Sequence, residues 1–283
     1  MKQSFSGDLK PRILSALVLA PIVLGAVWLG GLPFQIMLGV VIVLASYEWT
    51  HLTCGPGWYI DAVIIAGTAL GALQLAIIPG YMPSHMDDFS RLGFVAAAII
   101  SGMALLGSLG SIRGQPLRWR LLGVPYISLG PASLIWLREQ EDSGFLLTIW
   151  LLLLIWAMDI GAYIAGRAIG GPKLAPQASP NKTWAGLIGG MLSAATVGGF
   201  LGWSAPLVTD PAPILQMALM SALIGAWSQV GDIAESMVKR HFGVKDMSNL
   251  IPGHGGILDR IDGLLFAAPA MAIGVLILLV IGT

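Results

Sequence analysis

The sequence predicts an all-α polytopic membrane protein with about nine transmembrane helices. Of its 283 residues, 56% are hydrophobic and only 11% are charged, and the mean hydropathy is +0.81. Soluble domains usually contain about 25% charged residues. A helix of about 20 apolar residues spans a bilayer, and nine such runs can be counted in the sequence. An ordinary soluble domain is therefore excluded.

The nine runs divide the chain into two regions. Five runs fall within residues 1–140, and four fall within residues 141–283, which also contain the two longest polar loops, 166–183 and 235–262. No small-x-small cleavage site follows the first run, so we predict a retained helix and not a signal peptide. The runs lie at 13–31, 33–50, 59–79, 92–110, 121–137, 145–166, 184–203, 213–234 and 263–282.

The distribution of basic residues predicts the orientation. Lys and Arg near the ends of spans favour the cytoplasmic side. Thirteen of the fifteen lie in the amino-terminal tail and the loops 111–120, 166–183 and 235–262, all on one side of a nine-span chain, while Arg91 and Arg138 lie on the other. We therefore expect a cytoplasmic amino terminus, an outer carboxyl terminus and two long cytoplasmic loops.

Charge and cysteine content exclude two further classes of function. Lys plus Arg equals Asp plus Glu, so there is no net basic field of the kind that attracts nucleic acid. The single cysteine, Cys54, can form neither an internal disulfide nor a zinc-thiolate cluster. We interpret it as a small apolar core residue.

Carboxylates within or beside the spans are the first candidates for chemistry. Asp159 lies in the sixth run and Asp232 near the end of the eighth, and ionisable groups are costly in hydrocarbon. For Asp159 a structural hydrogen bond to a neighbouring helix is the alternative. Glu48 and Asp61 lie near span ends, where we expect solvent to reach them.

The 235–262 loop concentrates polar residues. If the helix that contains Asp232 continues, Ser236, Lys239 and Arg240 follow on the same face. The two cations could be simple lipid anchors. Lipid anchoring does not explain the residues that follow, however. Glycines let backbone N–H groups approach a phosphate, and carboxylates are suitable ligands for Mg²⁺. These residues are Lys245, Asp246, the turn Pro252-Gly253-His254-Gly255-Gly256, and Asp259-Arg260-Ile261-Asp262.

The 166–183 loop ends in Ser179-Pro180-Asn181-Lys182-Thr183 before a Gly-rich span. It lacks the Walker A pattern. A Ser/Thr/Lys cluster before a helix can hold a phosphate at the helix amino terminus. It can equally be a capped helix start with a positive flank, and the sequence leaves both interpretations open.

Two motifs resemble the phosphatidate cytidylyltransferase family, the CDP-diacylglycerol synthases. The carboxyl-terminal signature is filled by Ser236, Val238, Lys239, Arg240, Lys245, Asp246, Ser248, Pro252, His254, Gly255, Gly256, Ile257, Asp259, Arg260, Ile261 and Asp262. A second element is filled by Asp159, Ala162, Tyr163, Gly166, Arg167, Lys173, Leu174, Ser179, Pro180, Lys182, Thr183 and Trp184. The family commonly has Glu after this Trp, where the present chain has Ala185.

The resemblance implies a reaction, its substrates and a location. A phosphate oxygen of phosphatidic acid would attack the α-phosphorus of CTP, giving CDP-diacylglycerol and pyrophosphate. Family members use Mg²⁺, together with a second cation such as K⁺, and the resemblance also suggests a homodimer among membrane lipids. No organellar extension precedes the first run, so we expect the plasma membrane of a bacterium, with the active site facing the cytoplasm.

The resemblance also implies roles for individual residues. It makes Asp232 and Asp259 the metal ligands. The implied catalytic residues are Lys239, Arg240, Lys245, Asp246 and Asp262, and the implied substrate-binding residues are Asp159, Ser179, Lys182, Ser236, His254 and Arg260.

Two other classes of function remain as alternatives. An ion- or proton-coupled transporter would use Asp159 and Asp232 as a relay, but it gives no reason for the dense 236–262 segment. A CDP-alcohol phosphotransferase would also hold metals with aspartates, but the sequence contains no D-G-x-x-A-R element.

The first prediction is topological. A cysteine introduced at Ser248 should resist an impermeant thiol reagent added to intact cells and should react once the membrane is opened, because the 235–262 loop is expected in the cytoplasm. Labelling in intact cells would refute the orientation.

Overall fold

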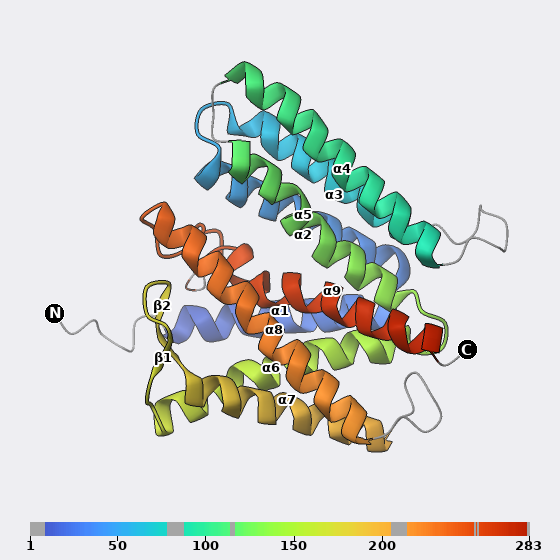
Figure 1. Cartoon of the computed structure of the whole chain (residues 1–283), viewed down its shortest axis with the longest axis vertical. Coiled ribbons are helices and arrows are strands. Elements are labelled where there is room, and N and C mark those ends of the chain that lie inside the picture. Colours follow the sequence, from blue (N-terminus) through green and yellow to red (C-terminus); the bar gives the residue numbers. More distant parts are fainter. Residues whose placement is uncertain are drawn as a thin grey trace. The chain divides into compact units, whose positions relative to one another are not determined.

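A computed structural model of the chain describes residues 9–77, 88–113, 117–204, 214–251, 253 and 255–281. These residues form nine helices and one antiparallel hairpin (Figure 1), and each of the nine predicted runs coincides with a helix. In chain order the elements are α1 (Leu9–Leu29), α2 (Gly31–Thr53), α3 (Trp58–Ile77), α4 (Asp88–Arg113), α5 (Leu117–Arg138), α6 (Gly144–Ala168), β1 (Lys173–Ala175), β2 (Ser179–Thr183), α7 (Trp184–Ser204), α8 (Ile214–His241) and α9 (Leu258–Ile281).

Seven of the described helices, α2, α3 and α5 to α9, are long and apolar enough to cross a membrane. Two shorter apolar stretches, Leu17–Leu29 and Val95–Gly107, lie in α1 and α4. The structure therefore confirms an all-α polytopic membrane protein, while the count of nine spans and the orientation stay predictions.

The chain divides into two compact units. The first contains residues 1–132 together with 242–261, and the second contains residues 133–241 together with 262–283. The main boundary lies close to the predicted division at residue 140. The segment 242–261, however, groups with the amino-terminal helices and not with the flanking parts of α8 and α9. Most of the carboxyl-terminal signature, from Lys245 to Ile261, thus belongs to the first unit.

Within the first unit, α3 packs against both α2 and α4. Trp49 of α2 is buried and donates its indole N–H to the carbonyl of Trp119 at 2.9 Å. A β-carbon added at Gly123 of α5 would collide with the Trp49 ring. Close packing around one large side chain therefore ties α2 to α5.

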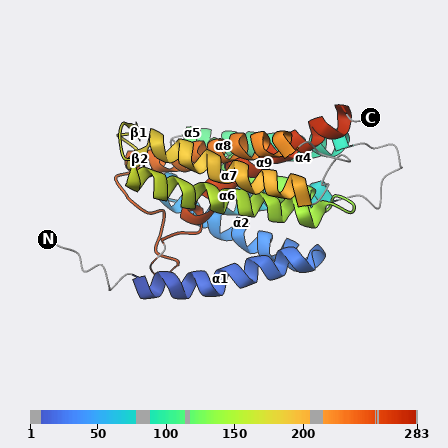
Figure 2. The same cartoon turned by 90° about the horizontal axis from the view of Figure 1, so that it is seen from below.

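Within the second unit, α7 packs along both α6 and α8, and the three helices lie side by side (Figures 1 and 2). Small residues allow these close approaches. A β-carbon at Gly161 of α6 would collide with Ser193 of α7, and one at Gly198 of α7 would collide with Ser221 of α8. The glycine-rich sequence of α7 is explained by this packing.

Two expectations about the first unit were wrong. Glu48 and Asp61 were expected to reach solvent, but each is only 1% exposed. The Nη2 of Arg120 lies 2.6 and 2.8 Å from the two Asp61 carboxylate oxygens, and the Arg120 side chain is fully buried. Proximity to a span end did not give exposure, because Arg120 of α5 binds Asp61 and the segment that leads into α9 binds Glu48.

Cys54 matches its interpretation as a core residue. It follows α2 and is 1% exposed, and burial raises the pKa of its thiol above the usual value. A buried protonated thiol reacts slowly. It should therefore add little background to the labelling of a cysteine introduced elsewhere.

We predict that Asp61→Asn lowers the free energy of unfolding by about 3–5 kcal/mol, because it leaves the Arg120 charge buried without a counter-charge. The double variant Asp61→Leu with Arg120→Met should recover most of this loss. Arg120 Nε and Nη1 have no hydrogen-bond partner among the described residues. An apolar replacement therefore removes the free-energy cost of burying these groups as well as the ion pair with Asp61. Thermal unfolding in detergent micelles measures both effects. A double variant as unstable as Asp61→Asn would contradict this account.

Candidate active site

A cavity of about 570 Å³ lies in the second unit, lined by α6, β1, β2, α7 and α8. Its volume is within the range of small-molecule sites. The lining combines carboxylates, cations and an amide with apolar and glycine surfaces. The lining residues are Asp159, Ala162, Tyr163, Gly166, Arg167, Leu174, Asn181, Lys182, Thr183, Gly186, Leu187, Gln229 and Asp232.

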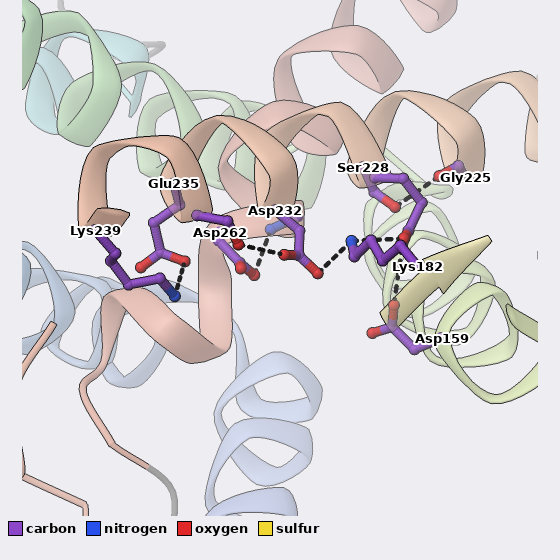
Figure 3. Close-up of polar contacts among 11 residues, drawn as sticks. Asp159, Lys182, Gly225, Ser228, Asp232, Glu235, Lys239 and Asp262 are labelled. Atoms are coloured by element: carbon purple, nitrogen blue, oxygen red, sulfur yellow. Dashed lines mark hydrogen bonds and ion pairs between the residues drawn. The ribbon is translucent and has the colours of Figure 1, made fainter. Parts of the chain in front are cut away.

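A chain of polar contacts crosses this cavity (Figure 3). Lys182 Nζ lies 2.5 Å from Asp232 Oδ2 and donates to Gln229 Oε1 at 2.7 Å. Gln229 Nε2 in turn donates to Asp159 Oδ1 at 3.1 Å. The two predicted intramembrane carboxylates, Asp159 and Asp232, are thus joined through one lysine and one amide. The hydrogen bond expected as the alternative for Asp159 is present.

The 166–183 segment contains a hairpin that the sequence did not predict. Strands β1 and β2 pair in antiparallel register, with Lys173 opposite Thr183 and Ala175 opposite Ser179. The carbonyl of Pro172 accepts the N–H of Trp184 at 3.1 Å. The packing of α6 along α7 brings the ends of the segment together, and this closes a ladder in a sequence that is not typical of strands.

The hairpin ends in a helix cap. Thr183 Oγ1 accepts the N–H of Gly186 at 3.0 Å, which satisfies one of the free amides at the start of α7. The interpretation of this segment as a capped helix start is therefore confirmed. Lys182, one residue earlier, lines the cavity instead, so the same segment supplies both a cap and a cation.

A second group of charges continues along α8. The helix runs unbroken to His241, so Asp232, Ser236, Lys239 and Arg240 are on one helix, as expected. Ser236 lies 3.4 Å from Asp232 Oδ1, and buried Lys239 pairs with Glu235 at 3.1 Å. Arg240 is exposed.

The third acid of this group comes from α9. Figure 3 shows Asp262 between Asp232 and Glu235; the charge of Asp232 acts on it electrostatically, and Glu235 is a side-chain hydrogen-bond partner. Several acids so close together need compensating positive charge, which Lys182 and Lys239 supply. Glu235 and Gln229 were not recognised from the sequence, although each occupies the same helix as Asp232 at a spacing of three.

In the first unit, the carboxyl-terminal signature forms a tight loop before α9. Asp259 is buried, and its Oδ2 accepts the N–H groups of Met247 and Gly256, each at 2.8 Å. Gly255 has φ +85°, and a β-carbon there would lie 2.9 Å from the same carboxylate oxygen. Asp259 therefore closes the loop on itself.

Glu48 supplies the remaining contacts to this loop. It accepts the N–H groups of Ile257 and Leu258 and the hydroxyl of Ser248. The glycine-rich turn was expected to offer its N–H groups to phosphate. Instead, the amides of residues 256–258 are bound by protein carboxylates, because two buried acids need those donors.

The predicted site residues are thus distributed over both units. Asp159, Lys182 and Asp232 line the cavity, and Ser236, Lys239 and Asp262 lie in the same unit. Ser179 is half-buried on β2, and His254 lies outside the described residues. The exposed residues are Arg240, Lys245, Asp246 and Arg260.

The metal assignment stays a prediction. Asp232 and Asp259 belong to different units. In the described part of the chain, no group of three or more His, Cys, Asp or Glu side chains is arranged to hold a metal ion. Ala185, which replaces the Glu common in the resembled family, lies in the first turn of α7 beside Gly186 of the cavity wall.

Comparison with known proteins decides the family. The model of the cytidylyltransferase family matches residues 10–278. The chain belongs to the cytidylyltransferase family. It is therefore a nucleotidyltransferase, and the resemblance drawn from the two motifs is confirmed.

Curated relatives of this cytidylyltransferase cover nearly the whole chain. A phosphatidate cytidylyltransferase of Brucella suis is 39% identical over 271 residues, which is 92% of this chain and 91% of the relative. Proteins of the same name from Pseudomonas aeruginosa and Bacillus subtilis are 38% and 31% identical, and each alignment covers 93% of this chain and 96% of the relative. The weakly diagnostic amino-terminal half is thus part of the family match.

Proposed function

We propose that this cytidylyltransferase is a phosphatidate cytidylyltransferase, which converts CTP and phosphatidic acid to CDP-diacylglycerol and pyrophosphate. The observation that carries the proposal is the cavity in which Lys182 joins Asp232 and Gln229. It lies among membrane-spanning helices, where a lipid substrate is available, and its charged lining suits a phosphate and its counter-ions. The relatives named above carry the same activity in their names.

The chemistry requires positioning and charge neutralisation. An oxygen of the lipid phosphate attacks the α-phosphorus of CTP, the bond from that phosphorus to the bridging oxygen breaks, and pyrophosphate leaves. No general base is needed, because the phosphate nucleophile is already ionised near neutral pH. Cations that meet the phosphates reduce the repulsion between two anionic substrates.

In this proposal the cations of the second unit meet those phosphates. Lys182 is positioned in the cavity by Asp232 and Gln229, and Lys239 by Glu235. Arg240, at the end of α8 in the same unit, is exposed. The resemblance adds Lys245 and Arg260, which are exposed residues of the first unit. Ser179 and Ser236 would help to hold CTP or the lipid phosphate.

The acids of the second unit fit a hard divalent cation. Asp232 and Asp262 offer carboxylate oxygens, the ligands that Mg²⁺ prefers, and the Lys182 ammonium already compensates Asp232. We propose that Asp232 holds Mg²⁺, with Asp262 as a supporting acid and K⁺ as a second cation. The resemblance assigns the same metal role to Asp259 and a supporting role to Asp246, both of which belong to the first unit. The metal would neutralise phosphate charge, and Lys182 would be released toward the substrate.

We further propose nine spans with a cytoplasmic amino terminus in the inner membrane of a bacterium. The asymmetry of Lys and Arg supports this orientation. The cavity residues Arg167 and Lys182 and the helix end at His241 all lie beside loops expected in the cytoplasm. This arrangement would place the site where CTP is present.

The function is tested with purified protein, phosphatidic acid and CTP labelled at either the α- or the γ-phosphorus. Label from the α-position should enter the lipid, and label from the γ-position should leave as pyrophosphate in equal amount. A transporter would incorporate neither label. A CDP-alcohol phosphotransferase would consume CDP-diacylglycerol and release CMP, so either result would refute the proposal.

Lys239→Ala and Arg240→Ala should each lower turnover by about tenfold or more, since a hydrogen bond to a charged group is worth about 1.5–3 kcal/mol. Arg138→Ala is the control, because it removes a basic residue from the end of α5 on the side expected to be outer. Thermal unfolding must accompany the Lys239 variant, which also leaves Glu235 without its ion pair. Normal kinetics in both variants would indicate that these residues serve only as membrane anchors.

Asp232→Asn should abolish Mg²⁺-dependent synthesis and the stabilisation that Mg²⁺ gives the wild type against heat. Asp259→Asn should also abolish synthesis, but it disturbs two backbone hydrogen bonds as well, so Asp232→Asn is the cleaner test. Asp142→Asn is the control, because Asp142 has φ +58° and Asn tolerates that conformation. A Mg²⁺ titration of synthesis measures the effect. Near-normal synthesis by Asp232→Asn would remove that residue from the metal site.

A further inference from the structure

Glu48, near the cytoplasmic end proposed for α2, is bound to residues of the carboxyl-terminal segment that lie 200 to 210 positions later in the chain. Its Oε1 accepts the hydroxyl of Ser248 at 2.6 Å and the N–H of Ile257 at 2.8 Å. Its Oε2 accepts the N–H of Leu258 at 2.8 Å. All of these residues belong to the first compact unit.

The burial of this carboxylate makes the three contacts necessary. Glu48 is 1% exposed, and among the described residues it has no cationic partner. A buried carboxylate without counter-charge is costly unless several donors bind it. The loop supplies all three donors, so the loop and the end of α2 depend on each other.

The contacts amount to a helix cap supplied by another helix. α9 begins at Leu258, and the N–H groups of a first turn have no partner within their own helix. A capping side chain normally comes from the residue just before the helix. Here Glu48 takes that role, and its negative charge also suits the positive end of the helix dipole.

The glycine next to the cap is explained by the same contact. A β-carbon added at Gly256 would lie 2.6 Å from Glu48 Oε1. Gly256 also donates its N–H to Asp259. Glu48 and Asp259 therefore bind three successive amides, those of residues 256–258, and the position of one carboxylate depends on the other through the backbone.

We propose that Glu48 is a positioning residue for nucleotidyl transfer. It holds the start of α9, and thereby orients Asp259 and Arg260 for the reaction, without touching a substrate. This inference rests on the proposed function, because Asp259 and Arg260 have their roles only within it. The amino-terminal helices then contribute to turnover as well as to membrane insertion.

Glu48→Gln tests the proposal with little change in volume. One carboxylate oxygen becomes an NH₂ group, which must face a donor N–H or hydroxyl of the loop. We expect kcat to fall by about tenfold or more, as for a lost hydrogen bond to a charged group, with little change in KM for phosphatidic acid. Deuterium exchange at the amides of Ile257 and Leu258 should become faster, because Glu48 is the acceptor of both and is weakened.

Thr50→Val is the matched control. Thr50 is buried on the same helix, and its hydroxyl bonds only to carbonyls of α2. It should keep the wild-type kcat and the wild-type exchange of the loop. An equal loss of kcat in Thr50→Val and Glu48→Gln would overturn the proposal, since any damage to α2 would then suffice.

Ser248→Ala covers the case in which Glu48→Gln does not fold. It removes one of the three donors, leaves the carboxylate in place, and frees the Leu250 N–H that Ser248 also binds. A lower kcat with faster exchange supports the proposal. A wild-type kcat in Glu48→Gln, or in Ser248→Ala where the first variant is unstable, overturns it.

The two proposals fail in different ways. If the wild type makes no CDP-diacylglycerol from CTP and phosphatidic acid, the proposed function fails, and the role of Glu48 in that reaction falls with it. If the wild type is active and Glu48→Gln is equally active while its loop exchanges faster, only the positioning role fails.

Discussion

Buried carboxylates determine much of how this membrane protein is assembled. An acid in an apolar environment needs a cation or several hydrogen-bond donors, and three acids here obtain them from a distant part of the chain. Asp61 pairs with Arg120, Asp232 with Lys182, and Glu48 with the loop before α9. An apolar helix surface can pack against many other apolar helices, whereas each of these polar contacts requires one particular partner. They therefore fix which helix ends meet.

The same acids account for how the candidate site is prepared for anions. Lys182 and Lys239 are both held by carboxylates, which positions their ammonium groups in a chain with few charges. In the proposed function, a phosphate or a divalent cation that enters the cavity would exchange partners with side chains that are already in place. The cost of burying these charges is thus met during folding, before any substrate binds.

The sequence predicted the helices and the family but not the contacts between segments. Hydropathy places each span because a helix in lipid satisfies its backbone internally, and the signature identifies Lys239, Asp259 and their neighbours without a gap. The role of Glu48 could not be recognised, because it depends on a contact with a segment 209 positions away in the chain. Gln229 was missed for the same reason, since a single amide has no periodic signal. The β1–β2 hairpin depends on the packing of α6 along α7, which hydropathy does not encode.

The structure also changes the role assigned to the glycines of the signature. A turn of glycines beside lysines suggests a phosphate cradle built from backbone amides. In this protein Gly255 and Gly256 leave room for Asp259 and Glu48, and the amides of residues 256–258 bind those carboxylates. If those amides are taken, the phosphates must be neutralised by side chains. That requirement explains why four Lys and Arg residues lie between positions 235 and 262. Fewer basic residues would be enough to anchor one helix end to lipid.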